Sequence, residues 1–176
     1  EKGCRILPCF VLRYTPFYQA VRKFIDSGRL GRVMSIRAME GVEAFHQAHS
    51  YVRGHWARTE DSSPMIVAKC SHDTDLICWF ADSAPKSITS FGRLDWFRKE
   101  NAPKGAPKRC SDGCPVAKDC IYDAHRYLTE KRNFLRMVMP GAEGETGAYE
   151  LPEEPILEFL KTSDWGRCVY HCDNDV

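Results

Sequence analysis

The sequence has neither a long apolar run nor a dominant charge. No apolar run approaches the roughly 18 residues that a membrane-spanning helix needs, and the first residues lack the charge-then-apolar order of a secretory signal. Lys and Arg number 25 and Asp and Glu number 24, so the formal net charge is +1. A chain this balanced has no sustained field to attract nucleic acid or an anionic membrane. We therefore expect neither as a partner, and we expect a cytoplasmic protein.

Cysteine is plentiful, but it does not fit a secreted disulfide scaffold. The nine cysteines run from Cys4 to Cys172, and several lie among apolar neighbours. Disulfide scaffolds are smaller than 176 residues and have an even number of cysteines. We expect reduced thiols, with some of them on a metal ion.

Apolar patterns predict four strands. Residues 4–12 are nearly all apolar, as in a strand covered on both faces. Residues 33–42 and 86–94 alternate apolar and polar side chains, as half-buried strands do. The strand-like residues 167–172 come just before the last residues, and Glu1–Gly3 are typical of a helix end with its glycine cap. Both ends therefore indicate an internal fragment of a longer protein.

Helical spacing predicts helices between these strands. Residues 15–28 and 63–80 each open with the N-cap and first-turn pair Thr-Pro or Ser-Pro and continue with apolar residues at helical spacing. Shorter helical stretches are expected at 123–139 and 156–161. Residues 98–122 are rich in Pro, Gly and Lys and lead into a cysteine cluster, so we expect an insert outside the core.

The helix expected at 63–80 carries groups suited to proton transfer. Lys69 lies three residues before His72 and four before Asp73, so the side chains share one helical face, and Asp75 lies one turn beyond His72. An imidazole titrates near neutrality, and a carboxylate can fix its orientation, as proton exchange with a hydroxyl requires. The alternative is a surface Lys–Asp pair beside a capped or core histidine.

The cysteine cluster has spacing that suits a metal ion. Three thiols lie within eleven residues, at Cys110, Cys114 and Cys120. Short-spaced thiols in a loop can wrap a tetrahedral zinc ion. We expect Cys168 as the fourth ligand, with Cys172 or His125 as substitutes, and a full set of protein ligands indicates a structural zinc. The alternative is three reduced thiols in a flexible insert.

Five segments occur in an order that resembles one enzyme family. They are RYTPFY at 13–18, SGRLGRV at 27–33, YVRGHW at 51–56, SPMIVAKCSHDTDL at 63–76 and GRCVY at 166–170. Together they resemble the glucose–fructose oxidoreductase and inositol dehydrogenase (Gfo/Idh/MocA) family. The resemblance implies an N-terminal Rossmann domain for NAD or NADP. It also implies a C-terminal domain with an open, mostly antiparallel sheet and helices on one face.

The resemblance implies an α+β fold that begins late in the intact protein. Residues 1–32 would be the last strand of a truncated Rossmann domain and its connecting helix. Residues 33–176 would be a substrate and oligomerisation domain, truncated at its C-terminus, with a Cys-rich insert at about 98–122. The family's glycine-rich loop and Glu-Lys-Pro motif are absent, so we expect the fragment to be inactive. A homodimer or homotetramer would form through the open sheet.

The resemblance also assigns catalytic roles. His72 aligns with the family's catalytic histidine, which handles the hydroxyl proton while hydride passes to the nicotinamide. Many members have an aspartate four residues before this histidine, where this chain has Ala68. We therefore expect Lys69 to take over part of the charge-stabilising role near His72.

Substrate contacts are expected in the His- and Arg-rich stretch 45–59, which has no clean period and is typical of a loop. By position, the resemblance places His49, Arg53 and Trp56 in the wall of the substrate site. An aromatic face packs against sugar C–H bonds, while Arg and His donate to hydroxyls. The alternative is a solvated loop with Trp56 in the core. We also expect Asp73 to contact the substrate and Arg13 the cofactor.

These expectations describe an NAD(P)-dependent oxidoreductase that acts on a sugar, cyclitol or related polyol. Two alternatives stay open. One is an NAD-dependent glycosidase of the same family, which oxidises its sugar transiently. The other is a non-catalytic sugar-binding or zinc-stabilised interaction protein. Ala68 favours the non-catalytic protein, whereas His72 and Lys69 argue against it.

Overall fold

The computed structural model describes residues 3–175, which divide into two compact units. Unit 1 consists of Glu1–Gly41 and Ile66–Phe91, and unit 2 of Val42–Met65 and Gly92–Val176. The glycine-capped helix end expected at Glu1–Gly3 lies, apart from Gly3, outside the described residues. Every helix in the described part of the chain is too short or too polar to cross a bilayer.

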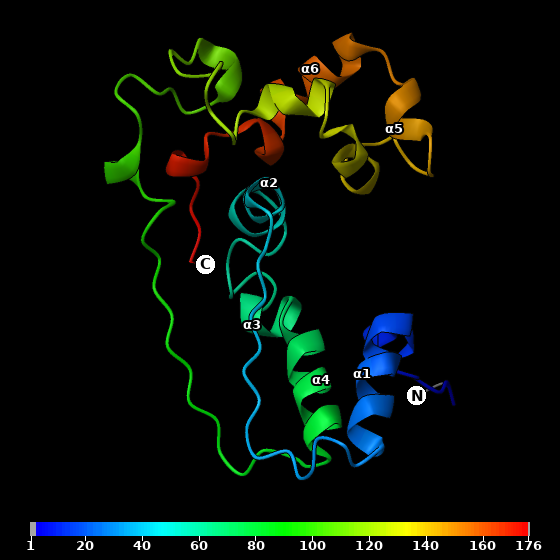
Figure 1. Ribbon diagram of the computed structural model, residues 1–176. Coiled ribbons are helices and arrows are strands. Elements are labelled where there is room, and N and C mark those ends of the chain that lie inside the picture. The colour runs from blue at the N-terminus through cyan, green and yellow to red at the C-terminus, as the bar shows by residue number, and fades with distance from the viewer. Residues whose placement is uncertain (1–2, 176) are drawn as a thin grey trace. The chain divides into compact units, whose positions relative to one another are not determined.

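Unit 1 is built around a pair of helices. The 3-10 helix η1 (Val11–Tyr14) leads into α1 (Pro16–Asp26), which starts at the predicted proline. Helix α4 (Ser71–Ala81) lies beside α1 (Figure 1). The rings of Tyr18 and Phe80 have centroids 6.3 Å apart, and Arg22 donates to the backbone oxygen of Trp79.

The helix predicted at 63–80 is interrupted. It consists of α3 (Met65–Ala68) and α4, separated by a turn at Lys69 and Cys70. Five consecutive polar residues open α4, and Ser, Asp and Thr lower helix propensity because their side chains compete for backbone hydrogen bonds. The hydroxyl of Thr74 bonds back to the oxygens of Cys70 and Ser71 at 3.3 and 3.0 Å. Lys69 therefore lies outside the helix that carries His72.

The open antiparallel sheet predicted from the sequence, and with it the α+β fold class, is wrong. Residues 3–175 contain no strand, and their β-type pairing is one isolated antiparallel bridge between Arg109 and Arg167. Residues 4–12, expected as the last Rossmann strand, are largely exposed coil that runs into η1. Residues 167–172 are coil followed by the 3-10 helix η8 (Val169–His171).

The alternating segments show why the prediction failed. Residues 33–42 and 86–94 are mostly exposed and are drawn as coil in Figure 1. Within the described residues, no backbone amide of either segment donates to another backbone. Alternation fixes which side chains share a face, but a strand forms only where a neighbouring backbone satisfies its N–H and C=O groups. The expected homodimer or homotetramer stays a prediction. The sheet through which it was expected to form is absent from the described residues.

Unit 2 consists of short helical segments. They are α2 (Ala44–Gln47), the π-helix η2 (Ala48–Arg53), α5 (Gly147–Glu150), α6 (Glu153–Thr162), and the 3-10 helices η3 (Lys99–Asn101), η4 (Cys110–Asp112), η5 (Ala124–Leu128), η6 (Arg132–Met137), η7 (Asp164–Gly166) and η8. The helix predicted at 123–139 is therefore two 3-10 segments, and the turn predicted at 156–161 lies within α6. The backbone of Thr129 leaves the helical region at φ −125° and ψ −113°, which ends η5.

The stretch 45–59 is a core helix over its first half, not the loop that its composition indicated. The side chain of Glu43 caps α2 by accepting from the backbone amide of His46 at 2.8 Å. All six residues of η2 are buried. Gly54 ends η2, and a Cβ there would lie 2.5 Å from the backbone oxygen of His49, so the chain turns closely at this glycine.

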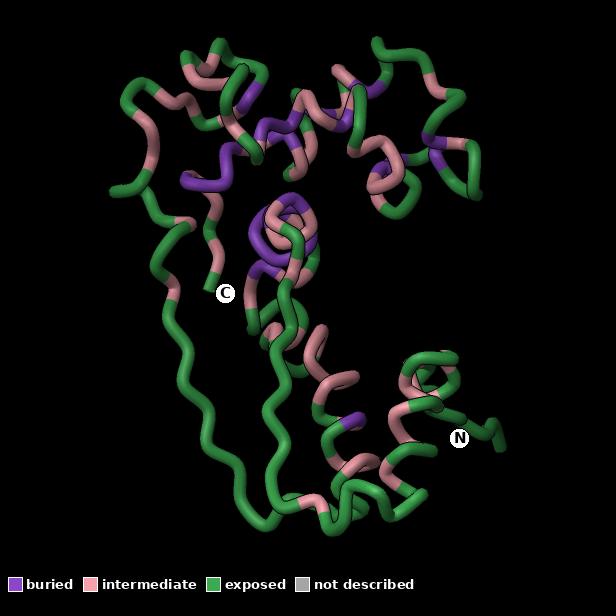
Figure 2. The backbone as a smooth tube through the Cα atoms, in the orientation of Figure 1, coloured by how far each residue is buried: buried purple, intermediate pink, exposed green. Residues whose placement is uncertain are grey.

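The apolar core lies in unit 2. One cluster is centred on Phe45, Tyr127, Leu135 and Ile156, and a second joins Ala48 and Val52 to Cys168, Val169 and Tyr170. Fully burying a side chain of this size contributes roughly 1.5–3 kcal/mol. In the described part of unit 1, by contrast, Leu76 is the one buried residue (Figure 2).

Candidate functional site

His72 is the second residue of α4 in unit 1 and is half-buried. Its ring meets Phe10 edge-on, with centroids 6.1 Å apart and planes at 87°. Phe10 is itself 37% exposed, so this contact is not deep apolar packing. The Nδ1 atom of His72 is buried and has no hydrogen-bond partner. A polar atom of this kind normally has a partner, which makes His72 a candidate for a bound group.

Lys69 and Asp73 do not pair with each other. The Nζ atom of Lys69 lies 3.8 Å from Glu40 Oε1, and Glu40 is a contact that sequence reasoning missed. Asp73 instead acts on the thiol of Cys70 through its charge. Burial, followed by the charges of Asp73 and Glu40, raises the pKa of Cys70. This thiol is therefore kept protonated, which disfavours it as a nucleophile.

Arg13, expected at the cofactor, makes a two-pronged ion pair with Asp75. The Nε and Nη2 atoms of Arg13 lie 2.7 and 2.6 Å from the two carboxylate oxygens. Its guanidinium also stacks 5.5 Å from the Trp79 ring centroid. The hydrogen bond to Asp75 raises the pKa of Arg13 above its ordinary value. The pair ties η1 to the helix that carries His72, within unit 1.

A second group of predicted residues lines a cavity of about 140 Å³ in unit 2. Its lining residues are His49, Ser50, Gly54, His55, Trp56, Met137, Val138 and Trp165. His49 and Trp56 were expected at a substrate, whereas His55 and Trp165 were missed. The rings of His55 and Trp165 meet at 5.3 Å, and the Nε1 atom of Trp165 is buried without a partner. His55 could have been found from its place beside Trp56, but no spacing in the sequence points to Trp165.

His49 is buried in this wall and held as a neutral ring. It is 3% exposed, and its Nδ1 atom lies 2.6 Å from the hydroxyl oxygen of Tyr127. Burial, with a smaller contribution from the charge of Arg53, lowers the pKa of His49 to about 3. Burial also raises the pKa of Tyr127. A neutral imidazole and a neutral phenol therefore share this hydrogen bond.

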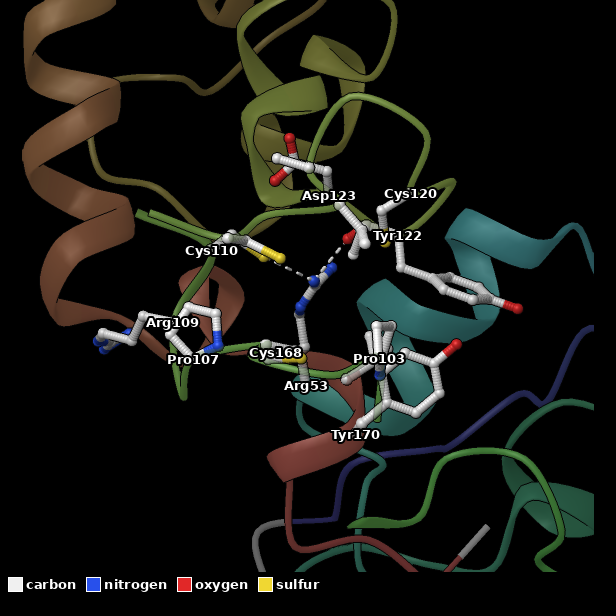
Figure 3. Close-up of a pocket in the computed structure, with 15 residues that line it drawn as sticks. Arg53, Pro103, Pro107, Arg109, Cys110, Cys120, Tyr122, Asp123, Cys168 and Tyr170 are labelled. Atoms are coloured by element: carbon white, nitrogen blue, oxygen red, sulfur yellow. Dashed lines mark hydrogen bonds between the residues drawn. The ribbon is translucent and has the colours of Figure 1, made fainter. Parts of the chain in front are cut away.

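Arg53 lies apart from that cavity and faces the cysteines (Figure 3). Its Nε atom donates to the oxygen of Arg167 at 2.6 Å, and its Nη2 atom donates to the oxygen of Tyr122 at 2.6 Å and to Cys110 Sγ at 3.7 Å. Arg53 is buried, with 3% of its surface exposed. Its expected role at the substrate stays a prediction.

The four cysteines predicted as metal ligands line the same cavity as Arg53. They are Cys110, Cys114, Cys120 and Cys168. All are free thiols. Within residues 3–175, no three side chains of His, Cys, Asp or Glu already stand at the spacing that holds a metal ion. The structure therefore brings the predicted ligands together without arranging them as a formed metal centre.

Comparison with known proteins identifies relatives of part of the chain. Residues 18–107 match the family model described as the GFO/IDH/MocA C-terminal domain. The protein named "Putative oxidoreductase YteT", from Bacillus subtilis (strain 168), is 26% identical over 122 residues. That alignment covers 67% of this chain but 28% of the relative. No solved structure matches the chain.

Proposed function

Because this chain belongs to the Gfo/Idh/MocA family, a family of oxidoreductases, we propose that the intact protein transfers hydride between a nicotinamide cofactor and a sugar, cyclitol or related polyol. The family model covers His72, Lys69 and the stretch 45–59. The chain spans less than a third of its curated relative, so this activity belongs to a longer protein than the chain.

The described residues do not form a dinucleotide site by themselves. Such a site needs a strand, a glycine-rich turn and a helix whose N-terminus faces the pyrophosphate, and residues 3–175 contain no strand. Two donor atoms of Arg13 are already bound to Asp75. We therefore place the binding of NAD or NADP outside this chain and assign the chain the proton chemistry.

His72 carries the proposal. Its Nδ1 atom is buried and unpartnered, and its ring is half-buried against Phe10. A general acid or base needs a ring nitrogen that can reach the reacting hydroxyl, and a group already bonded to the protein would have to give up that partner first. We assign His72 the transfer of a proton to or from the substrate hydroxyl.

Lys69 is proposed to stabilise charge on the substrate oxygen. Its ion pair with Glu40 is long at 3.8 Å, and the side chains are 28% and 41% exposed. An exposed pair of this kind contributes about 0–1 kcal/mol, so Lys69 can exchange Glu40 for a substrate oxygen at little cost. The turn that holds Lys69 outside α4 gives its side chain this freedom.

The aromatic cavity of unit 2 supports a sugar or polyol as the ligand class. Trp56, Trp165 and His55 supply ring faces, and the unpartnered Trp165 Nε1 supplies a donor. This combination suits a ring that has C–H faces and hydroxyl edges. The volume of about 140 Å³ is below the roughly 300–1,000 Å³ of sites that enclose drug-sized ligands, so the cavity fits a small group.

The test is a screen of the intact protein against polyols, sugars and aryl glycosides. A change in nicotinamide absorbance on adding a polyol supports the dehydrogenase. Release of an aglycone without net change of the cofactor would instead establish the glycosidase. Sugar binding without either response would overturn the proposal in favour of a binding protein.

A further inference from the structure

Two segments far apart in the sequence bring four thiols together. Cys110, Cys114 and Cys120 come from the predicted insert and its end, and Cys168 immediately precedes η8. The backbone amide of Cys168 donates to the oxygen of Lys108 at 2.9 Å, next to the Arg109–Arg167 bridge. These backbone contacts hold the two segments that carry the thiols side by side.

The cavity that these thiols line has room for a single ion. The cavity that they line has a volume of about 20 Å³, close to the roughly 10–15 Å³ that one water-sized sphere requires. An organic ligand does not fit this volume. Cys172 and His125, the substitutes considered for the fourth ligand, do not line the cavity. The Cys172 thiol instead donates to the oxygen of Cys168 at 3.3 Å.

A buried positive charge faces the thiols and takes part in none of the described ion pairs. Arg53 is 3% exposed, and its Nη1 atom is buried with no hydrogen-bond partner. The Asp123 carboxylate also lines the cavity, and its Oδ1 atom lies 3.0 Å from His125 Nδ1. A buried cation beside neutral thiols is costly, and deprotonated thiols would offset that cost.

We propose that Cys110, Cys114, Cys120 and Cys168 bind one structural zinc ion, with Arg53 as the residue that compensates its charge. Binding forms four Zn–S bonds and releases four thiol protons to solvent, with no change of oxidation state. Zinc with four thiolates carries two negative charges, and Arg53 offsets one of them. Since the thiols do not yet stand at ligand spacing, their side chains close around the ion as it binds.

The proposed zinc site would link two segments of the chain that both lie outside the part that matches the family model. The family model ends at residue 107, before the first of these cysteines. Cys168 belongs to the second core cluster of unit 2 and Cys110 to the first. A metal ion between them would join the insert to both clusters. This inference does not depend on the proposed enzymatic activity.

Metal content of the full chain, purified under reducing conditions, tests the proposal. We expect about one zinc per chain in the parent protein. The Cys114→Ser and Cys120→Ser variants should lose it, because they remove half-buried ligands with little change in volume. Cys172→Ser and Cys70→Ser are matched controls that should keep it. Absence of stoichiometric zinc from undamaged parent protein would overturn the site, as would a disulfide among the four cysteines.

Substitution with Co²⁺ distinguishes a variant that has lost a metal ligand from a variant that has failed to fold. Co²⁺ added to the metal-free chain should give the intense visible bands of a tetrahedral thiolate site, together with thiolate charge-transfer bands. Cys114→Ser should weaken these bands while the far-ultraviolet circular dichroism stays as in the parent. Unchanged bands in that variant would contradict the ligand set. Iron and inorganic sulfide in the parent would contradict the assignment of zinc.

The proposed charge compensation by Arg53 is tested by measuring zinc affinity. Arg53→Gln should bind zinc 10- to 100-fold more weakly than Arg53→Lys, because Lys keeps the charge and Gln does not. Zinc affinity is measured by competition with a chelator at fixed pH. Equal affinities in the two variants would show that Arg53 does not compensate the charge of the centre.

Discussion

At the scale of single residues, burial decides which titratable groups can act as acids or bases. His49 in unit 2 and His72 in unit 1 were both predicted as site residues, but their surroundings differ. His49 is 3% exposed and already bonded to Tyr127. His72 is half-buried and has an unpartnered Nδ1. The sequence offers both as candidates. We propose His72 for proton transfer, because His49 is held as a neutral part of a wall.

The neutral state of His49 makes stability depend on pH. Its pKa is about 3 when folded and 6.5 at its ordinary value, so between these values the unfolded chain binds the extra proton. Stability therefore falls as pH drops below about 6.5, and the loss from this group by pH 5 is about 2 kcal/mol. Urea unfolding at pH 7.5 and pH 5 should show a smaller difference for His49→Gln than for the parent. Equal differences would contradict the assignment.

Arg53 illustrates how far residue types alone could lead. The run YVRGHW predicted a polar wall, and arginine at a sugar site is chemically reasonable. In the structure, its guanidinium donates to two backbone oxygens and to the sulfur of Cys110. Close spacing led us to group Cys110, Cys114 and Cys120, and a strand expected at residues 167–172 led us to add Cys168. The strand is absent, but all four cysteines line one cavity. Nothing in the sequence linked Arg53 to them.

At the scale of elements, the ion pair between Arg13 and Asp75 links η1 to α4 inside unit 1. Asp75→Asn removes the charge and leaves the shape. Because the Arg13 side chain is 37% exposed, solvent screens the pair, and we expect a modest loss of stability. Amide hydrogen exchange along α4 should accelerate measurably, because opening of the helix then costs less free energy.

Asp26→Asn is the matched control for this change. Asp26 pairs with Arg22 at 2.8 Å on the same unit, but its side chain is 54% exposed. An exposed pair four residues apart on a helix contributes about 0.3–0.5 kcal/mol. If Asp26→Asn accelerated exchange in α4 as much as Asp75→Asn does, the linking role of Arg13 and Asp75 would be refuted.

Elements differ in how well the sequence predicted them, and the reason is local. Helix α1 was predicted from its first proline onward, because its capping and apolar spacing are properties of the segment itself. The segments 33–42 and 86–94 were wrongly assigned as strands, because pairing requires a second segment that the pattern does not specify. The stretch 45–59 was assigned as a loop because its polar residues conceal that Phe45, Ala48 and Val52 face a core.

At the scale of the whole molecule, the two units hold very different amounts of core. Unit 2 contains both apolar clusters, while Leu76 is the one buried residue in the described part of unit 1. Local opening requires less free energy where few apolar groups are buried. We therefore expect amides of α1 to exchange faster than those of α6, measured by mass spectrometry under native conditions. Equal protection of the two helices would contradict this difference.

Family membership was the feature of the whole chain that the sequence predicted best, and it is confirmed. Five short motifs in order carried that prediction, although none was sufficient alone. The sheet that the resemblance implied is absent from the described residues. Short motifs can identify the family of a chain, but they do not specify which backbone segments pair with each other.

The most direct test of the account is the turnover of the intact protein carrying His72→Ala, measured beside His125→Ala with the same polyol. Loss of a positioned acid or base costs roughly 10²–10⁴-fold in rate. We predict a fall of that size in kcat for His72→Ala, with little change in polyol affinity, and parent-like turnover for His125→Ala. Turnover of His72→Ala within two-fold of the parent would contradict the assignment of proton transfer to His72.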